Sequence, residues 1–509
     1  RRRRVAVARV FGRRALRSGR VFVTYESSGR VALVEGARDE PMRADGALTG
    51  ASPSAASTVE AAAETSAAVE SADELPDPPH WLRSVILFMS GQMVSMLGSM
   101  IVQFAVMWYM TIVYQSGLII AVVAVVGFLP QAIISIFGGV WADRHNRKRL
   151  VIGADAAIAL STLALALIIL SGFDAVWLIF LTLAVRSAGT GVQMPAASSM
   201  VPQITPRRHL MRVNGLMQSV NASMALLAPA LAGAVFGLAA AAAADGSGAP
   251  PPASVLVPIF MIDVVTAVFG IGLLAMIRVP TLARAEGEAD AGYFADLIGG
   301  VRYIAGHGFV RWLLFVYAGL FILIVAPANL TPLMLVRSFG GTESEDVLHL
   351  AVLEVAYSAG LVLGGIVIAM WGGLRNRLLL IVLAAFGFGT LSIGLGLSPS
   401  LLVFFACMAV LGVVSPFFGT SAMTLLQETV EPSRQGRVFG FVGIVTALAM
   451  PFGMAVFGPL ADVISVELLL VSAGLLTFVV MGLALVLPAG RRAMAAAREV
   501  SAPRRLGAG

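Results

Sequence analysis

Long apolar runs alternate with short polar gaps along most of the chain. From residue 84 onward each run holds roughly 20 residues, the length at which a helix crosses a hydrocarbon core about 30 Å thick. The runs are too long and too uniformly apolar to be strands of a membrane barrel. We therefore expect twelve transmembrane helices, near residues 84–112, 117–141, 149–172, 176–199, 209–238, 254–277, 311–337, 346–372, 377–397, 400–427, 434–461 and 464–488.

The composition and the placement of charge agree with this interpretation. Of the 509 residues, 58% are hydrophobic and 13% are charged, which is too little polar surface for a soluble protein of this length. The net charge of +6 comes almost entirely from arginine. In the apolar region the bases sit in short gaps between the runs, a pattern of membrane topology rather than of a phosphate-binding face. With both termini inside, Arg337 is the one base in an outer gap. The positive-inside rule therefore predicts cytoplasmic termini.

The two halves of the apolar region repeat each other. The matching pairs are Gly138-Gly139 with Gly364-Gly365, Gln203 to Pro206 with Gln427 to Pro432, Arg212-Val-x-Gly215 with Arg437-Val-x-Gly440, and AVFG at 234–237 with AVFG at 455–458. Six spans followed by six in the same orientation predict an all-α membrane protein made of two parallel six-helix repeats. In such folds the substrate binds near the bilayer midplane, between the halves.

The repeat divides the chain into five regions. We expect an N-terminal six-helix bundle at 80–277, a cytoplasmic linker at 278–310, a C-terminal six-helix bundle at 311–490 and a cytoplasmic tail at 491–509. Residues 1–79 are rich in alanine, serine and glutamate and lack a run that could span a bilayer, so we expect a disordered cytoplasmic extension.

A short gap that is dense in charge lies between the second and third spans and has the sequence GGVWADRHNRKRL, residues 138–150. A tight link between helices favours Gly139, and we expect Asn146 to take a left-handed conformation in the turn. Asp143 stands among bases, and a carboxylate is stabilised by the free N–H groups of a helix N-terminus.

This gap resembles the signature loop of the major facilitator superfamily, G-x-x-x-D-R-x-G-R-R/K. The matching residues are Gly139, Asp143, Arg144, Arg147 and Lys148, and Asn146 replaces one glycine. The resemblance implies that Asp143 holds the halves together on the cytoplasmic side, near Arg437 at the start of the eleventh span. Asp155, two turns into the third span, is expected to partner the basic loop.

Further segments, at 87–110, 186–196, 214–230, 262–270 and 436–462, resemble the bacterial macrolide-efflux branch of that superfamily. This resemblance covers about residues 80–490. It implies a drug exporter driven by the proton gradient in the bacterial inner membrane. The antiporter motif of the fifth span is retained only as Pro229 and Gly233.

Three further ionisable residues lie deep within predicted spans, where an unpaired charge costs about 2.5–3.5 kcal/mol on insertion scales. Arg186 in span 4 and Asp263 in span 6 lie at similar depths. The sequence leaves open whether they form a fixed pair or have separate functional roles. Glu354 in span 8 has no base at its depth in the second half. Because burial favours the neutral form of a carboxyl group, Glu354 is the first candidate for proton coupling, with Asp263 and Arg186 behind it.

Polar residues at helical spacing mark the faces of five spans. A stripe of this kind either joins packed helices or lines a cavity, and stripes on spans 1, 4, 5, 8 and 10 favour a shared cavity. The candidate cavity residues are Gln103, Gln193, Gln218, Asn221, Ser358, Thr420 and Thr424. Trp108 and Tyr109 are expected in the aromatic belt at the membrane surface, and Pro416 is expected to break span 10.

These features together predict a secondary active transporter that exports amphipathic, macrolide-like molecules by proton antiport. A siderophore or metabolite exporter on the same scaffold and a non-transporting receptor are the alternatives. A Walker A motif, a nucleophile elbow and a metal-ligand cluster are all missing from the sequence, so we expect no enzyme activity, metal or cofactor. We expect no nucleic-acid partner, and we expect the chain to act as a monomer in the bilayer.

Overall fold

The computed structural model describes residues 21–25, 31–35, 80–243, 250–277, 302–374, 376–430, 432–488 and 490–492. The chain divides into two compact units, residues 1–75 and residues 76–509. Each unit is described by itself.

The described part of the first unit is a β-hairpin. Strand β1 (Val21–Tyr25) pairs antiparallel with strand β2 (Val31–Glu35), with Val21 opposite Glu35 and Tyr25 opposite Val31. For these ten residues the structure differs from the disorder that we expected. The expectation of disorder rests on the overall composition of the extension, which does not show that it contains two short segments rich in valine. Valine favours strands because its branched side chain fits a pleated surface.

The second unit is helical, and the expected spans are confirmed. Twelve segments of its described residues are long and apolar enough to cross a membrane. The first six are α4 (Trp81–Tyr114), α5 (Gly117–Arg144), α6 (Arg147–Leu170), α7 (Val176–Ile204), α8 (Leu210–Ala243) and α9 (Val257–Ala275). The last six are α11 (Gly308–Asn329) with α12 (Thr331–Phe339), α13 (Glu343–Trp371), α14 (Arg377–Gly396), α15 (Leu401–Thr429), α16 (Pro432–Val463) and α17 (Val466–Val486).

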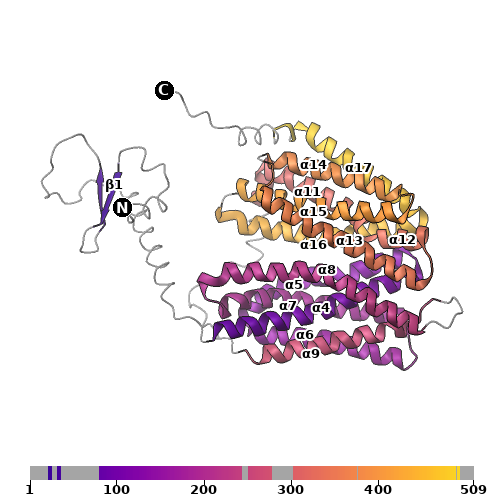
Figure 1. Cartoon of the computed structure of the whole chain (residues 1–509). Helices are drawn as coiled ribbons and strands as arrows, with labels where there is room; N and C mark the ends of the chain where they lie inside the picture. The colour runs from indigo at the N-terminus through magenta and orange to yellow at the C-terminus, as the bar shows by residue number, and fades with distance from the viewer. Residues whose placement is uncertain are drawn as a thin grey trace. The chain divides into compact units, whose positions relative to one another are not determined.

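The helices pack as two bundles with the same internal arrangement (Figure 1). In the first bundle α5 packs on α7, α4 on α8 and α9, and α6 on α7 and α9. In the second bundle α13 packs on α15, α11 on α16 and α17, and α14 on α15 and α17. The repeated glycines explain the closest crossing, since a side chain at Gly138 would meet the carbonyl of Gly191 and one at Gly364 that of Val413.

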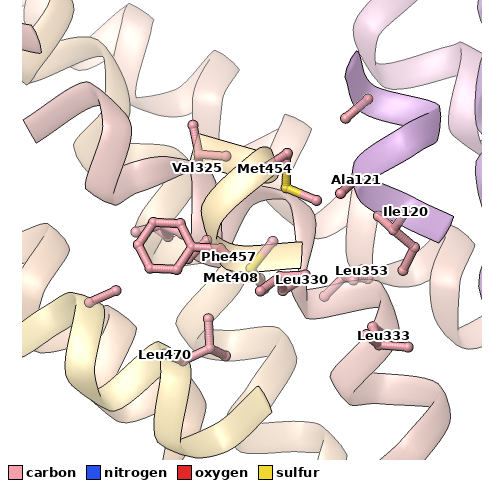
Figure 2. Close-up of a cluster of buried hydrophobic side chains, with 14 of the residues drawn as sticks. Ile120, Ala121, Val325, Leu330, Leu333, Leu353, Met408, Met454, Phe457 and Leu470 are labelled. Atoms are coloured by element: carbon pink, nitrogen blue, oxygen red, sulfur yellow. The ribbon is translucent and has the colours of Figure 1, made fainter. Parts of the chain in front are cut away.

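Two crossings join the bundles, α5 with α16 and α8 with α13. We call the end where α5 passes into α6 the basic end, and the end where α4 passes into α5 the opposite end. At the opposite end, Gly458 lies against Ala121, and Gly233 lies against Ala351. Figure 2 shows Ala121 of α5 beside Met454 of α16, within one hydrophobic core that spans both bundles.

The bundles separate towards the basic end. There α8 is exposed on nearly all sides, and 88% of Met211 and 54% of Leu216 are accessible. The structure is therefore closed at the opposite end and open at the basic end.

Three local expectations are wrong. Asn146 has φ −65° rather than a left-handed conformation, because it caps α6 and its Oδ1 accepts a hydrogen bond from Arg149 N at 3.2 Å. Trp108 is fully buried, since α4 runs between other helices at that level. Helix α15 continues through Pro416, whereas span 7 is interrupted at Leu330, and Pro332 lies in the first turn of α12.

Candidate transport site

A buried ion pair lies in the middle of the first bundle. Arg186 on α7 pairs with Asp263 on α9, and these residues are 8% and 1% exposed. Ser99 of α4 donates to Asp263 Oδ1 at 3.0 Å, and Arg186 Nη1 donates to Thr162 of α6 at 2.6 Å. The pair is thus held by side chains from four helices, which offsets the cost of burying two charges.

The close approach of α4 and α9 supports this pair. A side chain at Gly98 would lie only 3.2 Å from Asp263 Cα and would overlap Thr266 Oγ1. The glycine therefore lets the backbone of α4 approach closely enough for Ser99 to reach the carboxylate.

A second polar contact lies two helical turns away, between the same α6 and α7. Gln193 Nε2 donates to Asp155 Oδ1 at 2.7 Å. Because Asp155 and Thr162 are seven residues apart on α6, and Arg186 and Gln193 seven apart on α7, the two contacts lie on one helix–helix seam. We expected Asp155 to contact the basic loop, but its described hydrogen bond is with Gln193.

Glu354 on α13 differs from these acids. Among the described residues its carboxylate has no hydrogen bond or ion pair, although it lies well inside a membrane-spanning helix. One turn further on, the Tyr357 hydroxyl is 3.2 Å from Ser415 Oγ of α15. Glu354 is thus a carboxyl group within the membrane that has no partner among the described residues.

The candidate cavity residues fall into three groups. Gln103, Gln218, Asn221 and Thr420 are exposed, Gln193 and Thr424 are partly buried, and Ser358 is buried. Asn221 donates to Gln218 across one turn of α8 at 3.3 Å, and Gln193 is held by Asp155. Among the described contacts, none joins the polar face of α8 to that of α15.

The basic loop is bound to its own bundle. Arg147 Nη1 donates to the carbonyl of Ser199 at 2.8 Å, and Lys148 Nζ donates to those of Ala275 and Ile277 at 2.7 Å. These bonds place positive charge at the C-terminal ends of α7 and α9, where the helix dipole favours it. The side chains of Asp143, Arg144 and Arg437 and the burial of Gly139 are not described by the structure, so contact between Asp143 and α16 remains a prediction.

A charged cluster at the opposite end was not expected from the sequence. Asp462, at the end of α16, accepts hydrogen bonds from the first residues of α5 and pairs with Arg337 of α12 at 3.0 Å. A signal existed in the sequence, because Gly458-Pro-Leu-Ala-Asp462 repeats the G-x-x-A-D of Gly139 to Asp143. Within the described residues no group of three or more potential metal ligands is found.

Comparison with curated proteins identifies relatives that match most of the chain. Macrolide efflux protein A of Streptococcus pyogenes is 29% identical over 391 residues, which are 76% of this chain and 92% of the relative. The Enterococcus faecalis protein of the same name is 29% identical over 334 residues, covering 65% of this chain and 97% of its own.

Solved structures show the same fold at lower identity. A bacterial homologue of the iron transporter ferroportin has a TM-score of 0.55 at 20% identity, covering 79% of this chain and 98% of its own. A POT family transporter in complex with 5-aminolevulinic acid has a TM-score of 0.60 at 12% identity, covering 79% and 96%.

A match to a known protein family covers both bundles. Residues 88–454 match the Major Facilitator Superfamily, and residues 330–506 match it again. These matches cover most of the chain and agree with the two repeated bundles. The chain belongs to the Major Facilitator Superfamily, whose members are membrane transporters.

Proposed function

We propose that this transporter is an exporter of amphipathic, macrolide-like molecules in a bacterial cell membrane, driven by proton antiport and acting as a monomer. The observation that carries the proposal is the 29% identity to macrolide efflux protein A, which extends over 92% of that relative. A similarity of that extent includes both bundles and the crossings between them, and therefore the whole transport path.

Proton coupling is assigned to Glu354 because of the contrast between the acids within the spans. Asp263 has an arginine partner and Asp155 an amide donor, and both contacts favour a fixed structural role. Glu354 has neither among the described residues, so its charge is not compensated in the bilayer. A carboxyl group in that position gains and loses a proton according to whether water reaches it.

The arrangement of the bundles supports alternating access. The bases of the loops assign the basic end to the cytoplasm, so the structure is closed outside and open inside. Substrate enters between the bundles from the cytoplasm, beside the exposed polar residues Gln218, Asn221 and Thr420. Opening of the α5–α16 and α8–α13 crossings then releases it outside.

The test of this function is transport by the purified full chain in proteoliposomes with an imposed pH gradient. We expect efflux of a macrolide that requires the gradient and proton movement that requires the macrolide. A susceptibility panel in a pump-deleted bacterial host, with and without an uncoupler, defines the range of substrates. Macrolide transport at a rate that does not depend on the pH gradient would refute proton antiport. Failure of every amphipathic compound tested would refute drug export.

We expect Asp143→Asn to shift the protein towards the conformation that is open at the basic end, because the resemblance of its loop to the signature loop of the superfamily implies that this acid holds the bundles together there. The readout is the dipolar coupling between spin labels at Leu238→Cys and Leu348→Cys. These two exposed positions line one apolar groove between α8 and α13 at the opposite end. The background is Cys407→Ala, which removes the single native cysteine.

The expected result is stronger coupling, because a loss of about 1.4 kcal/mol in the Asp143 contact raises the ratio of closed to open molecules at the opposite end about tenfold. The matched control is Glu428→Gln, which neutralises an acid at the basic end that pairs with Arg377 inside the second bundle at 3.7 Å. If the two variants give the same coupling as the parent, Asp143 does not hold the bundles together.

A further inference from the structure

The acid at the end of α16 joins the two bundles at the opposite end of the molecule. Asp462 Oδ1 accepts a hydrogen bond from Gly117 N at 2.7 Å. Its Oδ2 accepts from Leu118 N at 2.9 Å and from Ser116 Oγ at 2.8 Å. All three donors belong to the start of α5, in the other bundle, so this one side chain caps a helix across the bundle interface.

Arg337 of α12 completes the cluster from the second bundle. Its Nε donates to the carbonyl of Gln115 at 3.0 Å, and its Nη1 donates to that of Ala461 at 2.6 Å. Gln115 ends α4 in a left-handed conformation with φ 45°, which turns its carbonyl out of the helix. An acid thus lies at the N-terminus of α5 and a base at the C-terminus of α4, and each suits the local helix dipole.

Below the cluster, α5 and α16 pack in direct backbone contact. A side chain at Gly117 would overlap the carbonyl of Gly458, and one at Gly458 would overlap Ala121. The bonds of Asp462 therefore form only when α5 and α16 are in direct contact. They are lost when this crossing opens.

The repeat places this cluster at one crossing only. In the AVFG repeat Gly458 corresponds to Gly237, which faces Val347 at the α8–α13 crossing. Four residues beyond Gly458 is Asp462, whereas four beyond Gly237 is Ala241. The two crossings share their glycine packing but differ in charge.

We propose that Asp462 and Arg337 form a latch that holds the extracellular side closed. This latch lies at one end of the α5–α16 pair, and the predicted Asp143 contact lies at the other end. The two helices are antiparallel, and each ends in G-x-x-A-D, so the two motifs lie at opposite ends of the pair. Loss of the Asp462 bonds favours the outward-open state. The assignment of sides rests on the proposed function, whereas the latch itself concerns only which end opens.

The test uses the spin-label pair at Leu238→Cys and Leu348→Cys in the full chain, because these labels lie on the other crossing and do not touch the latch. We expect Asp462→Asn to weaken the coupling, with the open population at this end raised about tenfold, as expected for the loss of about 1.4 kcal/mol in charge-assisted hydrogen bonds. Arg337→Gln should act in the same direction. The matched control is Glu467→Gln, an acid near the same end that bonds to Ser338 within the second bundle.

Coupling in Asp462→Asn that equals that of the parent overturns the latch, and so does an equal loss in Glu467→Gln. Ser116→Ala removes one hydrogen-bond donor to Asp462 and should weaken the spin-label coupling by a smaller amount. This variant tests the proposal if Asp462→Asn does not fold. If neither variant folds while Glu467→Gln does, Asp462 is structural and the proposal fails. Macrolide efflux by the parent is measured separately, so a failed latch is distinguished from a failed transport function.

Discussion

Glu354→Gln should abolish export driven by a pH gradient while leaving macrolide binding intact. Glutamine has the shape of the protonated glutamate but cannot release a proton, so the variant is fixed in one half of the cycle. In the proposed cycle, water from the outside protonates Glu354 in the parent, and opening towards the less acidic cytoplasm lets the proton leave. Drug-induced proton movement and uphill efflux in proteoliposomes should both fall more than about tenfold.

The control for this result is Glu345→Gln on the same helix. Glu345 accepts a hydrogen bond from Thr342 N at 2.9 Å in the capping box of α13, and glutamine can fill that role. We expect this variant to export at the parental rate. If Glu354→Gln still pumps at that rate with the parental dependence on the gradient, Glu354 is structural and Asp263 becomes the coupling candidate.

The second large effect concerns the buried pair of the first bundle. Asp263→Ala leaves the guanidinium of Arg186 without its counter-ion at a site that is almost fully buried. We expect a loss of about 3–5 kcal/mol in the free energy of unfolding, and a similar loss for Arg186→Ala. Thermal unfolding in detergent, followed by the recovery of monodisperse protein, measures both.

The double variant Arg186→Met/Asp263→Leu separates structure from function. Replacing both charges with apolar side chains removes the desolvation cost together with the attraction, so stability should return close to the parental value. A double variant as unstable as the single ones would contradict the fixed-pair interpretation. A double variant that folds but does not export would assign the pair a role in transport, the alternative that the sequence left open.

The architecture could be predicted because the bilayer constrains it so strongly. An apolar run of the right length has one stable conformation in hydrocarbon, so the helices follow from hydropathy, and the glycine pairs predict the repeat. The contrast between Glu354 and the other acids was also predictable in part, since it depends on which charges share a depth in the membrane.

The contacts between distant residues could not be predicted in this way. Apolar sequence does not show which face of α4 meets protein and which meets lipid, so Trp108 was misplaced. The partner of Asp155 depends on the rotation of α7, which brings Gln193 rather than a base to its carboxylate. Asp462 lies near a helix end, where an acid is common, and only the packing of α5 on α16 gives it donors.

The asparagines that cap the N-termini of α6 and α14 occupy equivalent positions in the two repeats, as expected for a duplicated chain. Asn146 Oδ1 accepts from Arg149 N at 3.2 Å, and Asn376 Oδ1 accepts from Leu379 N at 3.1 Å, at equivalent places in the two halves. A tandem duplication leaves such a pair behind when both copies still need the same helix start. The loop before Asn146 contains Asp143, whereas the loop from Gly372 to Arg375 contains no acid. The two copies therefore share the helix start and differ in the acid that precedes it, which is the acid predicted to act in gating.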